Sequence, residues 1–251
     1  MAQLGRKFTN YASMAKDAVK SEALGGVIQG RHLQHDTDFT CYQVAAWTDV
    51  SLDQAFKNLI KNLEQDRKAA KAEHVNAHIT LGLKGGRAEM ATVKPYQEQR
   101  KTNEELSYRV AQLRGRLATY TGHPTITVVV NIIQEADDSL RQYQGARIAE
   151  HGIDSSVLQS GDKDLWFTDG KHIKDGVIHV VDGYGVTKYK EVGNVKPKLV
   201  GRGTSWFWHQ MLMGDTADNI PGLPQVSARL MNEYLPTKTF NPKRKPAQCG
   251  E

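Results

Sequence analysis

Residues 126–138 read ITVVVNIIQEADD, a β-branched apolar run that ends in three acids. Residues 126–130 have the composition of a buried strand, which we expect to be central in its sheet. The acids open a predicted helix that continues to about Glu150. Ligands of open parallel sheets gather beyond the carboxyl ends of strands. This order of strand, acids and helix therefore predicts a binding site at the end of the strand.

Acids follow two further candidate strands, at residues 31–35 and 157–160. These acids are Asp36, Asp38, Asp162 and Asp164. Helical patterns lie at residues 52–72 and 96–120, and another candidate strand lies at 75–83. Strands that alternate with helices predict an α/β fold with a largely parallel sheet, in which these acids share one rim.

Residues 213–224 read MGDTADNIPGLP and place Asp215 and Asp218 before a stiff proline–glycine turn. With these two, the rim gathers up to nine carboxylates. The candidate metal ligands are Asp36, Asp38, Glu135, Asp137, Asp138, Asp162, Asp164, Asp215 and Asp218. Two like charges about 4 Å apart repel by on the order of 4 kcal/mol, so such a cluster requires either protonation or bound cations.

Oxygen ligands without paired cysteine and histidine spacing favour Mg²⁺ or Mn²⁺ over zinc. Two such ions activate water in phosphodiester hydrolysis, so the cluster predicts a two-metal hydrolase. Taken singly, each acidic motif is as typical of a helix cap, a helix N-terminus or a turn. The joint occurrence of the motifs favours the metal interpretation.

The chain has 251 residues, enough for one large domain or for a core with a small appendage. Its 39% hydrophobic and 24% charged residues are ordinary for a globular protein, and no apolar run reaches transmembrane length. The first 20 residues lack the apolar core of a signal peptide. Cys41 and Cys249 suit neither a disulfide framework nor a zinc site, which predicts a cytoplasmic protein.

Charge is unevenly distributed, although the formal net charge is only +5. Residues 84–116 hold eight Lys or Arg against four Glu, residues 135–182 hold ten acids against five bases, and residues 238–245 hold four bases. Basic flanks around an acidic centre suit a phosphate-bearing polymer, because bases hold its backbone while acids hold cations. Solvated faces would explain any single run equally well.

Three motifs carry a family resemblance, at residues 134–138 (QEADD), 160–165 (SGDKDL) and 214–222 (GDTADNIPG). With this order and spacing, residues 31–224 resemble the 5′-nuclease family of flap endonucleases and 5′–3′ exonucleases, and most closely those of short-tailed bacteriophages. The resemblance implies a PIN-like core with a mostly parallel sheet flanked by helices. It also implies a helical arch near residues 84–120 and a C-terminal helix–three-turn–helix segment that binds DNA.

The resemblance assigns the acids to two metal ions. Asp36 resembles the ligand from the first strand, with Asp38 as the second choice. The implied ligands of the first ion are Glu135, Asp137, Asp138 and Asp162, and those of the second ion are Asp164, Asp215 and Asp218. A potassium ion at the helix–three-turn–helix segment is implied as well.

The family's arch begins with Tyr-Lys-x-x-Arg, which corresponds here to residues 96–100 (YQEQR). Arg100 matches the arginine that faces the scissile phosphate. Gln97 stands where lysine is usual, so Lys101 or Lys94 is the candidate for the lysine's role. The candidate DNA-binding residues are Lys84, Arg87, Lys94, Tyr96, Arg109, Arg114, Arg116, Asn219 and Gly222.

Two further departures from the family pattern stand out. The aspartate expected after the second strand is absent from residues 79–84 (ITLGLK), so the first metal site is one ligand short unless Asp38 compensates. Residues 225–227 (QVS) replace the family's second glycine pair. The chain stops at Glu251 as if another helix followed, which favours a truncated chain or a motif finished by another segment.

We therefore expect an N-terminal arm at residues 1–30, a nuclease core at 31–203 and a helix–three-turn–helix segment at 204–251. The expected function is that of a divalent-metal-dependent 5′–3′ exonuclease or flap endonuclease, a monomer that cuts DNA without contacting membranes; whether it also cuts RNA–DNA hybrids is left open. The implied setting is phage replication or host-DNA degradation in the host cytoplasm.

Two alternatives remain open. One is a catalytically impaired DNA-binding relative of the family, which the missing aspartate and Gln97 favour. The other is a haloacid-dehalogenase-like phosphatase, because Asp36-Thr37-Asp38 has the Asp-x-Asp pattern of its nucleophile. The spacing of Asp215 and Asp218 is one residue too short for that second family.

Overall fold

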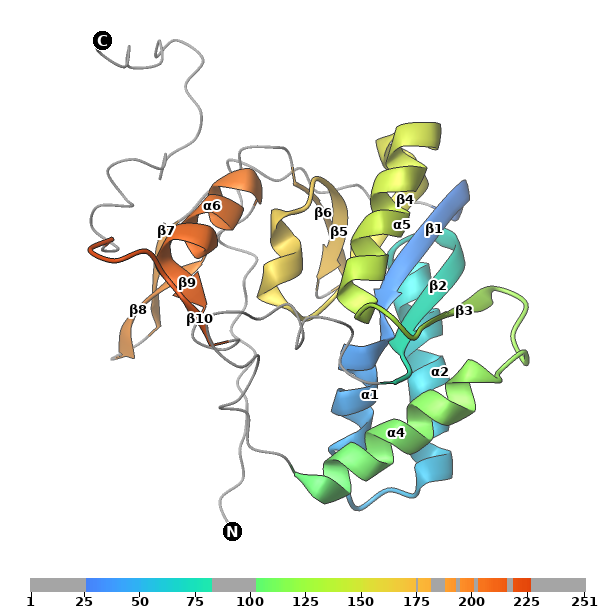
Figure 1. Cartoon of the computed structure of the whole chain (residues 1–251). Helices are drawn as coiled ribbons and strands as arrows, with labels where there is room; N and C mark the ends of the chain where they lie inside the picture. The colour runs from blue at the N-terminus through green and yellow to red at the C-terminus, as the bar shows by residue number, and fades with distance from the viewer. Residues whose placement is uncertain are drawn as a thin grey trace.

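The computed structural model describes residues 26–82, 103–174, 176–181, 188–192, 195–200, 203–215 and 219–226. At its centre is a six-stranded sheet with the order β3-β2-β1-β4-β5-β6 (Figure 1). These strands are β1 (Ile28–Asp36), β2 (Ala72–Thr80), β3 (Ile126–Asn131), β4 (Ser156–Gln159), β5 (Gly170–Lys174) and β6 (Val177–Val181). The first five run parallel and only β6 is antiparallel, so the predicted α/β fold is confirmed.

Helices connect the strands, and all but the last of them pack against the sheet. They are α1 (Thr37–Ala45), α2 (Leu52–Ala69), α4 (Glu104–Ala118), α5 (Ala136–His151) and α6 (Gly203–Met213), with short 3₁₀ helices η2 (Ile153–Ser155) and η3 (Lys163–Phe167). Side chains of Asp36, Ser51 and Asn103 cap α1, α2 and α4 by accepting a backbone N–H three residues on. Among these described helices, none is long and apolar enough to cross a membrane.

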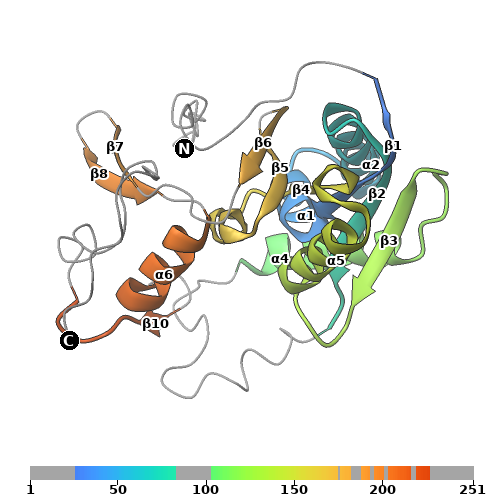
Figure 2. The same cartoon turned by 90° about the horizontal axis from the view of Figure 1, so that it is seen from above.

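Two small antiparallel ladders complete the described structure. One pairs β7 (Lys188–Val192) with β8 (Val195–Val200), and the other pairs β9 (Gly214–Asp215) with β10 (Ile220–Pro221). Both lie away from the β3 edge of the main sheet (Figures 1 and 2). The ladder of β9 and β10 follows α6 directly in the chain.

The expectation that residues 126–130 form a central strand is wrong, because β3 lies at the edge of the sheet. The centre belongs to β1, which pairs with both β2 and β4. Val130 is 40% exposed in β3. β-Branched composition therefore reflected strand propensity here, and not burial by two neighbouring strands.

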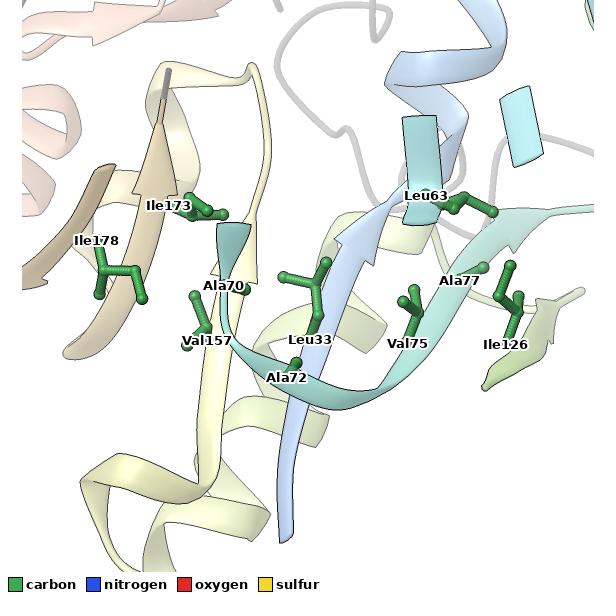
Figure 3. Packing of buried hydrophobic residues seen from close by; sticks show 10 residues of the cluster. All are labelled: Leu33, Leu63, Ala70, Ala72, Val75, Ala77, Ile126, Val157, Ile173 and Ile178. Atoms are coloured by element: carbon green, nitrogen blue, oxygen red, sulfur yellow. The ribbon is translucent and has the colours of Figure 1, made fainter. Parts of the chain in front are cut away.

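One face of the sheet is apolar and packs against α2. Leu33, Val75 and Val157 from three neighbouring strands meet Leu63 of α2, and all four side chains are fully buried (Figure 3). Because side chains alternate along a strand, the residues that precede and follow these three on each strand point to the opposite face. That face is covered by α5 (Figure 2).

The face under α5 carries buried polar side chains. Gln34 Oε1 accepts hydrogen bonds from Asn76 Nδ2 at 3.1 Å and from His78 Nε2 at 3.0 Å. His78 Nδ1 lies 2.8 Å from Ser139 Oγ on α5. Burial lowers the pKa of His78 to about 3, so the ring is neutral and Nδ1 accepts a hydrogen bond from the Ser139 hydroxyl. This network fixes the first turns of α5 against β1 and β2.

Candidate active site

The site begins at Asp36, the last residue of β1 and the N-cap of α1. Its carboxylate accepts hydrogen bonds from Phe39 N at 3.0 Å and from Ser160 Oγ at 2.5 Å. The side chain is almost completely buried, and this desolvation raises its pKa to about 6. A buried carboxylate whose pKa is raised by desolvation is electrostatically suited to a cation.

The loop after β4 continues the site from Asp36. Ser160 Oγ accepts a hydrogen bond from Asp162 N at 3.0 Å while its hydroxyl donates to Asp36. Asp162 Oδ1 in turn accepts from Asp164 N at 3.0 Å and caps η3. The helix-cap interpretation of this motif is thus confirmed, and the cap places two acids at the carboxyl end of β4.

Helix α6 reaches the same loop. The side-chain amide of Gln210 donates a hydrogen bond to Asp164 Oδ1. Gln210 and Asp164 are 46 residues apart in the sequence, and both side chains are half-buried. An acid assigned to the second metal is therefore held by a residue from the segment expected to grip DNA.

A third group of acids lies where β3 leads into α5. Glu135 is the N-cap residue of α5, and Asp137 and Asp138 lie in its first turn. Ala136 N donates to Thr80 Oγ1 at 2.9 Å, so the end of β2 holds the start of this helix. The acids therefore combine a favourable place at a helix N-terminus with a place at the carboxyl edge of the sheet.

Asp38 is held by protein groups in the described structure. Its two carboxylate oxygens accept from Thr80 N at 3.1 and 3.2 Å, and Arg114 Nε lies 2.7 Å from Oδ1. Burial raises the pKa of Asp38 although Arg114 lowers it. These contacts connect α1 to α4 and to the end of β2, the place where the family aspartate is missing.

Asp215 lies in the short ladder that follows α6. Ile220 pairs with Asp215, and Pro221 pairs with Gly214. A Cβ atom on Gly222 would lie 2.4 Å from Met213 O, and one on Gly214 would lie 2.3 Å from Gly222 N. Both glycines are required by this close backbone approach, a reason that differs from the expected phosphate contact of Gly222.

Asn219 stands next to this ladder. It has a φ of 62°, a left-handed conformation that asparagine tolerates better than most residues. Its side chain is buried, with 9% exposure. Asn219 itself has a turn conformation, whereas Asp215 lies in β9 and Asp218, the other predicted turn former, lies outside the described residues.

The three described arginines expected to contact DNA are engaged by the protein. Arg109 donates to the carbonyl oxygens of Ala45, Trp47 and Val50 at 2.8–3.0 Å. Arg114 pairs with Asp38, and exposed Arg116 Nη1 donates to Asp53 Oδ1 at 2.7 Å. Their contact with DNA stays a prediction. In the described structure, these guanidinium groups instead hold α4 against α1 and α2.

Several expected site residues fall outside the described residues. The metal ligand among them is Asp218, the catalytic candidates are Arg100 and Lys101, and the DNA-binding candidates are Lys84, Arg87, Lys94 and Tyr96. The arch as a whole is described only in its last helix, α4. Within the helix–three-turn–helix segment, the description ends at residue 226.

The acids gather at one edge of the sheet but are not closely clustered. Within the described residues, no three His, Cys, Asp or Glu side chains form a group that could hold a metal ion. The chemistry of the donor set nevertheless fits a hard divalent cation, since every candidate ligand is a carboxylate. Asp36 also fits such a cation, because it is a buried carboxylate whose pKa is raised by desolvation.

Residue patterns missed the polar residues that support the acids. Ser160, Gln210, His78 and Ser139 each bond to an acid or to the helix turn that carries acids. Ser160 lies within the motif at residues 160–165, and a hydroxyl two residues before Asp162 is a common turn signal. Gln210 gave no local signal, because its partner is distant in sequence.

No protein-family model and no curated protein matches the chain. Solved structures do match. A flap endonuclease of bacteriophage T5, solved as a pseudo-enzyme–product complex with DNA and metal ions, has a TM-score of 0.56 and 14% identity, over 81% of this chain and 73% of that chain. The T5 5′-exonuclease with bound zinc has a TM-score of 0.56 and 17% identity, over 81% of this chain and 74% of that chain.

A mutant of the T5 5′-exonuclease matches as well, with a TM-score of 0.51 and 18% identity, over 81% of this chain and 71% of that chain. At these identities the likeness concerns the fold, and it agrees with the mostly parallel sheet and flanking helices described above. The resemblance drawn from the three acidic motifs is thereby confirmed at the level of the fold. The chain has the PIN-like 5′-nuclease fold of the T5 exonuclease.

Proposed function

We propose that the protein is a divalent-metal-dependent 5′ nuclease that hydrolyses DNA phosphodiesters as a 5′–3′ exonuclease or flap endonuclease. One observation carries the proposal: acids stand at the carboxyl ends of three parallel strands, β1, β3 and β4, in a 5′-nuclease fold. Ligands of open parallel sheets bind at that edge. The solved relatives were crystallised with DNA or with divalent metal ions, which supports the same ligands here.

The acids divide into two groups by position. Asp36 and Asp162 are joined through Ser160 at the ends of β1 and β4, and we assign them to a first ion. The further ligands of this ion are Glu135, Asp137 and Asp138. We assign Asp164, Asp215 and Asp218 to a second ion. Mg²⁺ or Mn²⁺ at these places would supply an activated water and would neutralise charge on the leaving oxygen.

The rest of the chain would bind and orient the nucleic acid. We assign Arg100 and Lys101 to the charge that develops on the phosphate. The basic residues of 84–116, with Tyr96, would guide the 5′ strand. Residues 219–222, with a potassium ion, would hold the duplex backbone. We propose that the protein is a monomer that acts on DNA ends, flaps or RNA–DNA hybrids. The setting that we propose is phage replication or host-DNA degradation in the host cytoplasm.

A catalytically impaired DNA-binding relative is the second candidate. Thr80 occupies the end of β2 where the family has an aspartate nearby, and its backbone N–H is covered by Asp38. The phosphatase alternative is weaker, because its nucleophile would be Asp36. That carboxylate is 6% exposed and accepts hydrogen bonds on both oxygens, so it is poorly placed to attack a substrate.

The discriminating experiment uses 5′-labelled blunt duplex, 5′-flap and RNA–DNA hybrid substrates with Mg²⁺. We expect wild-type protein to release labelled products, and Asp162→Asn to bind the substrates without cutting them. Asp49→Asn is the matched control, since Asp49 is exposed and lies outside the site. Binding without any product from wild type would favour the impaired relative. Mg²⁺-dependent cleavage by Asp162→Asn would contradict the metal assignment.

Asp215→Asn with Asp218→Asn tests the second group of acids. We expect the double variant to need more Mg²⁺ for the same rate, because the second ion loses two charged ligands. Cleavage rate against Mg²⁺ concentration measures this. An unchanged titration curve would remove both residues from the metal site.

A further inference from the structure

Helix α6 contacts the acidic edge of the sheet at two points. At the first point, the amide of Gln210 donates to Asp164 Oδ1. At the second point, the ring of Phe207 packs 5.4 Å from the ring of Phe167, measured between centroids. Both partners belong to η3, which α6 packs against.

The first contact ends a continuous line of hydrogen bonds. Ser160 Oγ donates to Asp36, Asp162 N donates to Ser160 Oγ, and Asp164 N donates to Asp162 Oδ1. Gln210 then donates to the side chain of Asp164. This line runs from the central strand β1, through the loop after β4, to α6. The orientation of Asp164 is therefore fixed from both sides, by its own backbone in η3 and by Gln210.

The second contact leads to the acids of α5. The guanidinium carbon of Arg141 lies 4.9 Å from the centre of the Phe167 ring. Arg141 also pairs with Asp138 Oδ1 at 2.9 Å. Phe167 therefore lies between a residue that holds an α5 acid and Phe207 of α6. Through these packed side chains, α6 touches supports of both groups of acids.

Helix α6 is also the direct neighbour of the turn expected to hold DNA. It ends at Met213, and Gly214 and Asp215 follow as β9. Leu223 N donates to Leu212 O at 2.9 Å, so the stretch after the turn is bonded back to the helix. This backbone contact joins the stretch after the turn to α6, the helix that carries Gln210.

We infer that Gln210 is a positioning residue that sets the orientation of the Asp164 carboxylate toward a divalent metal ion and so connects the DNA-gripping segment to the metal site. This inference rests on the proposed function. A hydrogen bond donated to one oxygen of a carboxylate restricts its rotation, so a ligating carboxylate held in this way keeps one orientation. Loss of such supporting contacts reduces metal affinity by about 10- to 100-fold in metalloproteins.

Calorimetric titration of the metal-free full chain with MnCl₂ tests the inference without requiring activity. We expect Gln210→Leu, which keeps much of the side-chain volume but cannot donate, to lower Mn²⁺ affinity by about tenfold. Gln54→Leu is the matched control, because Gln54 is exposed on α2 and, in the described contacts, its side-chain amide donates only to Asn58 Oδ1, at 3.0 Å. The control is expected to bind Mn²⁺ as wild type does.

Thermal unfolding of each metal-free variant separates positioning from folding. If Gln210→Leu does not fold, Gln210→Asn replaces it, since asparagine keeps the amide but is too short to reach Asp164. If a folded Gln210 variant binds Mn²⁺ with wild-type affinity, the role of Gln210 is overturned, but the proposed function is not. A wild-type chain that binds no Mn²⁺ overturns the proposed function and this role with it.

Discussion

The two faces of the central sheet are built from neighbouring residues of the same strands, but one face stabilises the fold and the other positions the acid-bearing turn of α5. Leu33 of β1 points into the apolar layer under α2, whereas Gln34 joins the polar network under α5. Burial of apolar surface stabilises the fold without fixing one side-chain geometry, because dispersion and hydrophobic forces are non-directional. Hydrogen bonds are directional, so the polar face can hold the acid-bearing turn of α5 in one place.

Leu33→Ala is expected to have the largest effect on stability. It leaves a cavity beneath α2 where the side chain is fully buried, and it should lower the free energy of unfolding by about 3 kcal/mol. Urea unfolding measures the loss. In the folded protein, Mn²⁺ affinity should stay as in wild type, because no acid-supporting contact is removed. A loss of Mn²⁺ affinity would show that the two faces are not separable.

Gln34→Leu makes the opposite change on the opposite face. It adds apolar volume but leaves Asn76 Nδ2 and His78 Nε2 without their shared buried acceptor, so we expect a loss of about 2 kcal/mol. Unlike Leu33→Ala, it should also weaken Mn²⁺ binding, since His78 holds Ser139 of α5. A stabilised variant with normal Mn²⁺ affinity would contradict the positioning role of the polar face.

The pH dependence of stability reports on His78. Its pKa is about 3 in the folded chain against an ordinary value of 6.5, so the unfolded chain binds a proton that the folded chain rejects. The stabilising contribution is therefore complete above pH 6.5 and is lost as the pH falls toward 3. From pH 7.5 to pH 5, His78 should cost about 2 kcal/mol of unfolding free energy. In His78→Gln this part of the slope should vanish, and an equal slope in both proteins would refute the assignment.

Ser139→Ala should give the smallest of these effects. It removes the hydroxyl that donates to His78 Nδ1 at 2.8 Å and leaves the rest of the network intact. We expect a loss of about 1 kcal/mol in unfolding free energy and a measurable fall in Mn²⁺ affinity. Ser107→Ala on α4 is the control, because Ser107 is exposed and far from the network. Equal unfolding free energy and equal Mn²⁺ affinity in the two variants would show that Ser139 does not position α5.

Local patterns predicted the parts of the molecule that depend on neighbouring residues. The strand–acid–helix order around Glu135 and the cap at Asp162 both follow from spacing, and the structure has them. The edge position of β3 in the sheet could not be predicted from spacing, because an edge strand and a central strand share the same β-branched composition. Partners such as Gln210 and Asp164 were beyond reach as well, since only the folded chain brings them together.

We propose that these acids form a metal-dependent nuclease centre on this fold. Incubating wild-type protein and Asp162→Asn with a 5′-labelled DNA flap, with Mg²⁺ and with EDTA, tests it most directly. We expect labelled product from wild type with Mg²⁺ alone, and bound but uncut DNA with Asp162→Asn. Equal cleavage by both proteins, or cleavage by wild type in EDTA, would contradict it.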